Sequence, residues 1–320
     1  MPHILIPDNL EKIGLNLLTQ AEGVTIQAPA KMSRDEVLAV VGDADGMIIR
    51  SGTKANAELL QKAAKLKAIV RAGVGVDNVD LVKATELGIA VMNTPAGNTV
   101  ATAEHTMALM LALARHIPKA QISMLEGQWE RKAFMGTELR GKTLGIIGFG
   151  RVGQAVAKRS LAFEMNVIAY DPYVSKQVAQ SLNVALLSLD ELLARADYLT
   201  LHTIVTPETE HLIDAENIAK MKDGVRLINA ARGTLVNEHD LAEAIKSGKI
   251  TGAALDVYAE EPPQKDNPLI GLSGIIHTPH LGASTLEAQE AVAAEAAEIM
   301  LDALLRNEYR NVVNREVQVG

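Results

Sequence analysis

The sequence predicts an α/β protein made of two doubly wound domains, each built around a parallel sheet. Short apolar runs rich in β-branched residues alternate with stretches of helical pattern along most of the chain. Within these runs polar and apolar residues hardly alternate, which is typical of strands that helices cover on both faces. The chain has 320 residues, and domains of about 150 residues are common, so two domains of this kind are expected.

A first series of strands and helices occupies the N-terminal part of the chain. Strands are predicted at residues 3–6, 24–26, 46–50, 66–70 and 89–93, with helices between them at 9–20, 34–41 and 55–63. Strands that alternate with helices in this way form parallel sheets joined by helical crossovers. This part therefore predicts the first sheet.

A long helix is predicted next, at residues 98–115. Its apolar groups cover much of the helical surface, as in a helix buried between domains or between subunits. A second series of strands follows at residues 143–148, 166–170, 198–202, 225–229, 252–257 and 275–278. The Ala- and Glu-rich stretch 284–306 predicts a last helix that returns to the first domain. The domains are thus expected at 1–97 with 290–320, and at 98–289.

The composition excludes several classes of protein. The net charge of -8 provides no basic surface for nucleic acid or an anionic membrane. The chain has no cysteine, which excludes disulfides, thiolate nucleophiles and zinc–thiolate sites. No cluster of other metal-ligating residues indicates a metal site. The N-terminus lacks the basic region of a signal peptide, and the longest apolar run, 106–114, is too short to span a bilayer. A cytoplasmic protein with a small-molecule substrate is expected.

Two segments match phosphate-binding patterns, and only one has the right context. The segment GTELRGKT (136–143) matches the triphosphate-binding loop, but such a loop must follow a strand and open a helix. Here polar residues precede it and a strand follows it. The pattern Gly148-Phe-Gly150-Arg-Val-Gly153 instead ends a strand and opens a helix, as in a dinucleotide-binding turn.

An acidic residue completes this second pattern. Asp171 ends the next predicted strand, 18 residues beyond Gly153, where a carboxylate accepts hydrogen bonds from the adenosine ribose. Pro172 and Tyr173 follow it, so no adjacent cation is available for a 2′-phosphate. NAD is therefore expected rather than NADP.

Three polar residues follow consecutive strands of the second domain and are candidates for the chemistry. A protein that transfers hydride to or from a carbonyl needs a proton donor and a cation for a substrate carboxylate. Arg232, Glu261 and His280 lie at the carboxyl ends of their strands, where ligands of doubly wound sheets bind. Each is also compatible with an ordinary loop residue, and His202 at the end of another strand is a weaker rival.

These residues stand in longer segments that resemble the D-isomer-specific 2-hydroxyacid dehydrogenases over essentially the whole chain. The segments are RAGVGVDNVD (71–80), MNTPAGNTVATAEH (92–105), WERKAFMGTELRGKTLGIIGFGRVG (129–153), NAARGTLV (229–236), AALDVYAEEPP (253–263) and HTPHLGAST (277–285). The resemblance implies a Rossmann NAD domain inserted into a flavodoxin-like substrate domain. It also accounts for the segment 136–143, which is the family's lead-in to the dinucleotide-binding strand.

The resemblance implies a role for each residue of the site. His280 would be the acid–base group, Glu261 would raise its proton affinity and fix its tautomer, and Arg232 would bind the carboxylate. Similar formate dehydrogenases carry glutamine in place of Glu261, and Asp256 would hold the nicotinamide carboxamide. The residues implied for the cofactor are Gly148, Gly150, Arg151, Val152, Gly153, Asp171, Thr203, Pro207, Ala230, Asp256 and Gly282. Those expected at the substrate are Arg50, Arg71, Val74, Gly75, Asn98, Arg131 and Lys132.

Two of these residues bear on the choice of substrate. A phosphate dianion needs several cations, and Arg50 and Arg71 end neighbouring predicted strands of the first domain, although both could be plain surface charges. The segment 129–137 resembles the family's dimer-crossing loop, through which Arg131 and Lys132 would reach the neighbouring subunit. Together with the buried helix at 98–115 it implies a homodimer or a dimer of dimers.

The expected activity is NAD-dependent oxidation of 3-phospho-D-glycerate to 3-phosphohydroxypyruvate in serine synthesis. A glyoxylate or hydroxypyruvate reductase of the same family is the alternative enzyme; such reductases often prefer NADPH, against which Asp171 argues. An NAD-sensing corepressor without physiological turnover is a more distant alternative, because such proteins share the fold but carry long tails. Longer members add a serine-sensing regulatory domain, and a sequence that stops at Gly320 fits either the short type or a shortened chain.

Overall fold

The computed structural model describes residues 1–317, which divide into two compact units. Unit 1 comprises residues 1–98 and the segment from Ser284 onward, and unit 2 comprises Thr99–Ala283. The second expected boundary, 289/290, falls inside a helix, whereas the units divide just before that helix. Residues 318–320 of the expected 290–320 segment lie outside the described residues.

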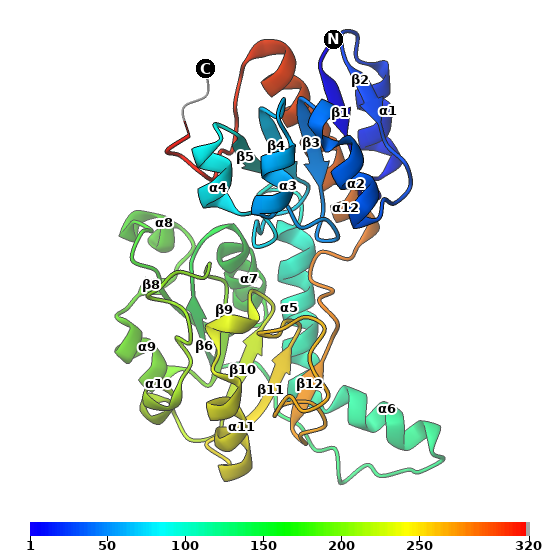
Figure 1. The fold of residues 1–320 in the computed structure, drawn as a ribbon. Coiled ribbons are helices and arrows are strands. Elements are labelled where there is room, and N and C mark those ends of the chain that lie inside the picture. The colour runs from blue at the N-terminus through cyan, green and yellow to red at the C-terminus, as the bar shows by residue number, and fades with distance from the viewer. Residues whose placement is uncertain (318–320) are drawn as a thin grey trace. The chain divides into compact units, whose positions relative to one another are not determined.

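The sheet of unit 1 consists of five parallel strands in the order β2-β1-β3-β4-β5, the order of flavodoxin-like folds. The strands are β1 (His3–Leu5), β2 (Thr25–Gln27), β3 (Gly46–Ile49), β4 (Ala68–Arg71) and β5 (Ala90–Asn93). The helices are α1 (Lys12–Gln20), α2 (Arg34–Val40), α3 (Ala57–Lys62), α4 (Leu81–Glu86) and α12 (Leu286–Leu301). Figure 1 shows α12 returning from the end of the chain to this sheet.

Small residues let α12 pack closely on unit 1. A Cβ added to Gly14 of α1 would overlap the backbone of Ala293 in α12, so the two helices meet nearly backbone to backbone. Val292, Ala296 and Met300 contribute to the core beneath α1, while α2, α3 and α4 cover the opposite face. The predicted helix 284–306 ends as a regular α-helix at Leu301 and closes with a π turn, Asp302–Arg306.

The sheet of unit 2 consists of seven parallel strands in the order β12-β11-β10-β9-β6-β7-β8. This is the order of a Rossmann sheet with one added strand. The strands are β6 (Thr143–Ile147), β7 (Asn166–Tyr170), β8 (Ala185–Leu186), β9 (Tyr198–Leu201), β10 (Val225–Asn229), β11 (Ile250–Leu255) and β12 (Ile275–His277). The two-residue strand β8 was not predicted because it is too short to show a pattern.

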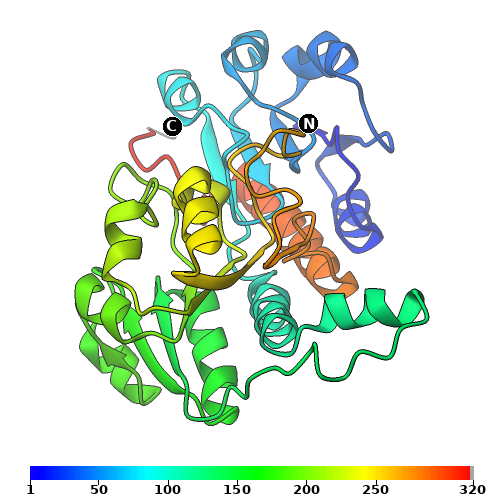
Figure 2. The same ribbon diagram turned by 90° about the horizontal axis from the view of Figure 1, so that it is seen from below.

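Helices cover both faces of this second sheet (Figure 2). They are α5 (Thr99–Arg115), α6 (Ile117–Leu125), α7 (Arg151–Ala162), α8 (Lys176–Ser181), α9 (Leu189–Arg195), α10 (Ala215–Lys220) and α11 (Glu238–Ser247). The core beneath α5 and α7 is separate from the core beneath α9, α10 and α11. No helix among residues 1–317 is long and apolar enough to cross a membrane.

Two helices of unit 2 differ from ordinary buried helices. Helix α5 is mostly buried, but Val100, Glu104 and Ala108 are exposed in the single chain, so its expected burial between domains or subunits stays a prediction. Helix α6 and the loop after it project from the rest of the unit (Figures 1 and 2). We call residues 117–137 the arm.

Candidate active site

The candidate active site lies where β10, β11 and β12 end side by side in unit 2. Parallel strands bring their carboxyl ends to the same edge of a sheet, and the register pairs Asn229 with Leu255 and Leu255 with His277. The loops that leave this edge carry Arg232, Glu261 and His280.

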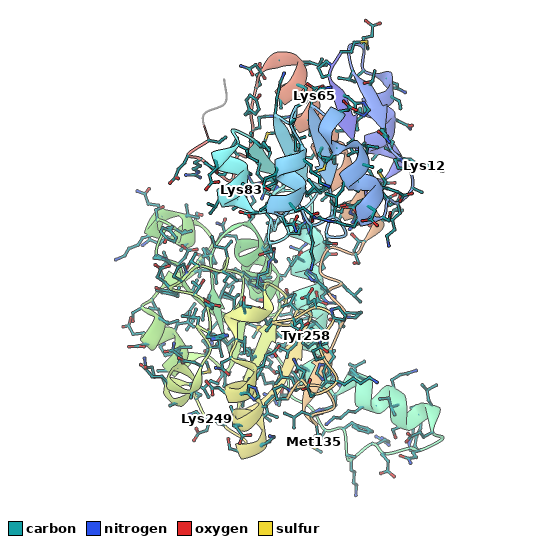
Figure 3. All side chains as sticks on the ribbon, in the orientation of Figure 1. Lys12, Lys65, Lys83, Met135, Lys249 and Tyr258 are labelled. Atoms are coloured by element: carbon teal, nitrogen blue, oxygen red, sulfur yellow. The ribbon has the colours of Figure 1, made fainter. Side chains whose placement is uncertain are left out.

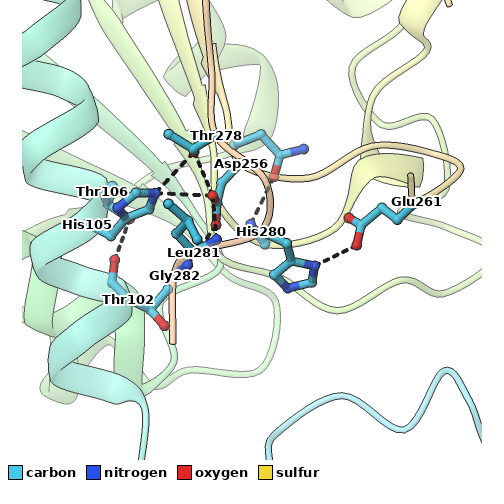
Figure 4. Close-up of polar contacts among 11 residues, drawn as sticks. Thr102, His105, Thr106, Asp256, Glu261, Thr278, His280, Leu281 and Gly282 are labelled. Carbon is cyan, nitrogen blue, oxygen red and sulfur yellow. Dashed lines mark hydrogen bonds and ion pairs between the residues drawn. The ribbon is translucent and has the colours of Figure 1, made fainter. Parts of the chain in front are cut away.

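His280 and Glu261 are in direct contact. His280 Nδ1 lies 2.6 Å from Glu261 Oε2, a short distance typical of a charge-assisted hydrogen bond, and Figure 4 shows the two side chains facing each other. The side chains remain 51% and 37% exposed, so the pair is open to a ligand. Since Nδ1 is occupied by the carboxylate, Nε2 is the ring nitrogen left to react.

The contact sets the protonation of both partners. The hydrogen bond that His280 donates to Glu261 raises the pKa of His280 against the effect of burial. The charges of Glu261 and Asp256 add to the rise, while Arg232 opposes it. For Glu261 burial is the largest influence and works against ionisation. The contacts with His280, the N–H of Tyr258 and the charge of Arg232 together still lower the pKa of Glu261. A carboxylate thus faces an imidazole that binds its proton tightly.

Arg232 is held on a tightly built turn after β10. Asn229 Oδ1 accepts from the N–H of Ala231 at 3.0 Å, and its Nδ2 donates to the carbonyl of Arg232 at 2.8 Å. The next residue, Gly233, packs so closely on Tyr258 that an added Cβ would overlap the Tyr258 carbonyl. The loops that carry Arg232 and Glu261 therefore touch through their backbones, with no space for a side chain at position 233.

Asp256 holds the loop of His280 from beneath. Its fully buried carboxylate accepts from the N–H groups of Leu281 and Gly282 at 2.7 and 2.8 Å and from Thr278 Oγ1 at 2.6 Å. His105 Nε2 on α5 lies 3.2 Å from the same carboxylate, as Figure 4 shows. Burial opposes ionisation, but the hydrogen bonds from His105, Thr278 and Leu281 lower the pKa of Asp256. The carboxylate expected at the nicotinamide is thus already in contact with four donors of the protein.

These contacts support an uncommon backbone conformation. His280 has a φ of 56°, in the left-handed region that residues with a side chain rarely occupy. The N–H of His280 donates to the carbonyl of Asp256 at 2.9 Å. Asp256 therefore binds this loop through its carbonyl as well as its carboxylate, and it keeps the imidazole directed at Glu261.

The rival histidine differs in its protonation. His202 Nε2 lies 3.0 Å from Thr200 Oγ1, and burial lowers the pKa of His202 to about 3. Its imidazole is therefore neutral across the ordinary pH range and no carboxylate raises its proton affinity. Of the two candidates, His280 has the properties of an acid–base group.

The glycine pattern forms the expected turn between β6 and α7. Gly148 has a φ of +90°, and a Cβ there would overlap the backbone of His202. A Cβ on Gly153 would likewise overlap the carbonyl of Gly148, whereas one on Gly150 would meet no atom within 4 Å. The first and third glycines thus allow close packing, and the second leaves open space at the start of α7.

Asp171 lies beside this turn. Its carboxylate accepts from the N–H of Phe149 at 2.7 Å, and from those of Tyr173 and Val174 at 2.8 and 3.1 Å. The acid that ends β7 thereby ties its own loop to the glycine turn. The other residues expected at the cofactor lie at the same sheet edge or in the loops beyond it: Arg151 and Val152 open α7, Thr203 and Pro207 follow β9, Ala230 follows β10, and Gly282 follows His280.

Unit 1 has its own group of expected substrate residues. Arg50 follows β3 and Arg71 ends β4, and the register that pairs Ile49 with Arg71 makes the two arginines neighbours along the sheet edge. The guanidinium of Arg50 donates to Gln289 Oε1 on α12. Val74 and Gly75 lie in the loop after β4, and Asn98 is the last residue before α5.

Arg131 and Lys132 lie elsewhere, on the arm of unit 2. Both are exposed in the turn that follows α6. The structure of the single chain does not bring them to the edge where β10–β12 end.

Sequence reasoning missed several residues that support the site. His105 was read only as part of a helix and His277 as part of a strand, yet both contact residues of the β11 loop. Thr278 and Tyr258 stood inside recognised segments without an assigned role. A polar residue within an otherwise apolar strand or helix was the available signal, but its partner depends on tertiary packing.

Comparisons with known proteins identify the family that the chain resembles. Residues 107–282 match the family described as D-isomer specific 2-hydroxyacid dehydrogenase, NAD binding domain. A D-3-phosphoglycerate dehydrogenase of Methanocaldococcus jannaschii is 50% identical over 98% of this chain and 60% of its own length. The chain thus spans about 60% of the length of this relative.

Solved structures share the fold of both units. A glyoxylate reductase from Paecilomyes thermophila matches 98% of this chain and 99% of its own, with a TM-score of 0.88 and 30% identity. An NAD-dependent formate dehydrogenase from Staphylococcus aureus, solved in complex with NAD, matches 97% and 98% of the two chains, with a TM-score of 0.84 and 31% identity.

Proposed function

The chain belongs to the D-isomer specific 2-hydroxyacid dehydrogenase family, and from that premise we propose that it oxidises 3-phospho-D-glycerate to 3-phosphohydroxypyruvate with NAD. The observation that carries the chemistry is the 2.6 Å contact between His280 and Glu261, with Arg232 on the adjoining loop. The relatives named D-3-phosphoglycerate dehydrogenase support the choice of substrate. The step would belong to serine synthesis.

The glycine turn fits a dinucleotide. The open space at Gly150 lies beside the first N–H groups of α7, where the pyrophosphate of NAD would accept hydrogen bonds. Asp171 would accept from the ribose hydroxyls and repel the 2′-phosphate of NADP. When bound, NAD supplies the hydride acceptor for the C2 hydrogen of the substrate.

The proton and the carboxylate are handled by the protein. In oxidation, the neutral Nε2 of His280 takes the proton of the substrate hydroxyl, and Glu261 stabilises the resulting imidazolium through Nδ1. In reduction, the same imidazolium returns the proton to the carbonyl oxygen. Arg232 binds the substrate carboxylate with its planar fork and polarises the reacting carbonyl.

The phosphate would be bound by the arginines of unit 1. Arg50 and Arg71 leave adjacent strands at the same sheet edge, and the neutral partner Gln289 orders Arg50 without cancelling its charge. Two neighbouring guanidinium groups give a phosphate dianion both charge and directed hydrogen bonds. Val74, Gly75 and Asn98 would contact the carboxylate and hydroxyl end of the substrate.

The arm supports a homodimer. Its exposed apolar residues are Ile117, Ile122, Met124, Leu125, Trp129 and Met135, which are 52–81% exposed in the single chain; Figure 3 labels Met135 on the loop after α6. Contiguous apolar residues of this kind mark interaction sites. A second copy of the chain would cover them, and Arg131 and Lys132 would then reach the partner's substrate.

The substrate is tested by comparing kcat/KM with NADH for 3-phosphohydroxypyruvate, hydroxypyruvate and glyoxylate. We expect a preference of about 100-fold or more for the phosphorylated substrate, equivalent to about 2.7 kcal/mol. Arg71→Gln should reduce that preference while leaving the value for hydroxypyruvate nearly unchanged. Equal values for the three substrates, or a preference for glyoxylate, would refute the assignment and favour the reductase.

A further inference from the structure

Tyr258 and His277 form a polar pair within the core of unit 2. The Tyr258 hydroxyl lies 2.8 Å from His277 Nδ1, and the two rings stack with their centroids 6.1 Å apart at 21°. Tyr258 is 7% exposed and belongs to the core beneath α11. Figure 3 places Tyr258 beside the ends of β10 and β11. None of the roles described above uses this pair.

The environment of the pair favours the neutral form of both side chains. Burial, with the nearby carboxylates, raises the pKa of Tyr258 to about 12, and burial lowers the pKa of His277. Near neutral pH a protonated hydroxyl therefore faces a neutral imidazole, and the hydroxyl donates to Nδ1. Nε2 of His277 is buried and has no hydrogen-bond partner among residues 1–317, so Tyr258 is the one anchor of this ring.

The backbone of Tyr258 leads directly to the acid–base pair. Its N–H donates to Glu261 Oε1 at 3.2 Å, and the other oxygen of Glu261 bonds His280 at 2.6 Å. On its far side the Tyr258 carbonyl packs against Gly233. Tyr258 thus lies between the Arg232 loop and Glu261, and its hydroxyl fixes it to β12.

The charged groups that face His280 and Tyr258 come from four elements. Those facing His280 are Glu261 and Asp256 from β11 and its loop and Arg232 from the β10 loop. His105 of α5 acts through Asp256, and Glu238 at the start of α11 acts on Tyr258 and accepts from the N–H of Ala259 at 3.0 Å. The hydroxyl and His277 add no charge to this set, so their effect on His280 must come from position.

We propose that Tyr258 and His277 are positioning residues that hold Glu261 against His280 and thereby set the basicity of the imidazole. The inference rests on the proposed function, in which His280 moves the proton. Loss of the hydroxyl frees Tyr258 from β12 and weakens the alignment of Glu261 with Nδ1. His280 then loses part of the stabilisation of its charged form.

The chain offers matched variants for a test. Tyr258→Phe removes the hydroxyl, and His277→Leu removes its acceptor while Tyr258 stays intact. His277→Asn restores an acceptor near the Nδ1 position. Tyr198→Phe is the control, because Tyr198 is fully buried in the same unit and its hydroxyl lies 3.1 Å from Thr137 Oγ1, away from this loop.

The first readout is the pH titration of His280. NMR monitors its imidazole resonances in the full-length protein without substrate. We expect Tyr258→Phe and His277→Leu to move the titration to lower pH, in the direction of Glu261→Gln but by less. His277→Asn should bring it back toward wild type, and Tyr198→Phe should leave it unchanged. A titration that is unchanged or moves to higher pH in both Tyr258→Phe and His277→Leu would overturn the proposal.

The second readout separates this inference from the assignment of the substrate. The pH profile of kcat/KM for 3-phosphohydroxypyruvate should shift as the titration does, with a fall of about three- to tenfold and an unchanged Kd for NADH. If the wild type does not reduce this substrate, the proposed function fails while the NMR titration still decides the role of Tyr258. If Tyr258→Phe does not fold, the two His277 variants still test whether the pair positions Glu261.

Discussion

A histidine can serve as acid or base near neutral pH because its ordinary pKa lies near 6.5. In this chain the contact with Glu261 raises the pKa of His280. The two directions of the proposed reaction need different protonation states of this imidazole. Carbonyl reduction requires the protonated imidazole, so its rate falls as the pH rises through the pKa of His280. Oxidation requires the neutral imidazole and has the opposite dependence.

Replacement of Glu261 by glutamine tests this dependence. Glu261→Gln keeps the shape of the side chain but removes the charge, so the pKa of His280 should fall. The decline of kcat/KM for reduction should then begin at lower pH, and kcat near neutral pH should drop by about 10- to 100-fold. An unchanged pH profile would show that Glu261 does not control His280.

The proposed role of Asp171 in the choice of cofactor can also be tested with single variants. The variant Asp171→Ala removes the carboxylate that would repel a 2′-phosphate, so the ratio of kcat/KM for NAD to that for NADP should fall by about tenfold or more. Because Asp171 also accepts from three backbone N–H groups, stability should fall too. Asp171→Asn keeps an acceptor there and isolates the charge. A constant ratio in both variants would place the selectivity in other residues.

At the scale of elements, the loops after β10, β11 and β12 act as one assembly. Asp256 binds the His280 loop through its carboxylate and its carbonyl, Gly233 packs on Tyr258, and His105 links α5 to Asp256. Each loop is thus held by contacts with its neighbours in addition to those within the loop. This explains how a histidine with a positive φ can be kept in one orientation.

The arm projects from its own unit, and its exposed apolar residues are the basis of the expected dimer. Trp129, the single tryptophan, is 73% exposed in the chain. Trp129→Asp should weaken association by about 2–4 kcal/mol if it is a central contact. Sedimentation over a range of concentrations measures this effect.

A matched substitution makes that experiment specific. Val82 on α4 is 71% exposed and lies outside the arm, so Val82→Asp should leave the sedimentation unchanged. The dimer would not involve the arm if Trp129→Asp and the wild type sediment alike at every concentration.

At the scale of the whole molecule, the sequence was sufficient to predict the fold class and nearly every strand. Uninterrupted apolar runs identified the parallel strands, and among residues 1–317 only the two-residue strand β8 was not predicted. The helix at 98–115 shows the limit of such patterns, because its composition indicates burial but does not say whether another domain or another subunit covers Glu104 and Ala108, which are exposed in the single chain.

The places of the candidate residues in the fold were predictable where a local sequence pattern marks them. Glycines, an acid at the right spacing and polar residues after strands located Asp171, Arg232 and His280. The supports of the site were not predictable, because the contacts of His105 with Asp256 and of Tyr258 with His277 join residues 151 and 19 positions apart. Such contacts depend on the register of strands and the packing of a helix, which no local pattern specifies.

The central claim is that His280 moves the proton while a separate glycine turn holds NAD. It is tested most directly by measuring turnover of 3-phosphohydroxypyruvate and binding of NADH in His280→Ala. We expect kcat to fall by about 1,000-fold or more, with the Kd for NADH within about twofold of wild type, because Gly148–Gly153 and Asp171 are untouched. Turnover close to that of the wild type would contradict the role of His280, and loss of NADH binding would contradict the separation of the two sites.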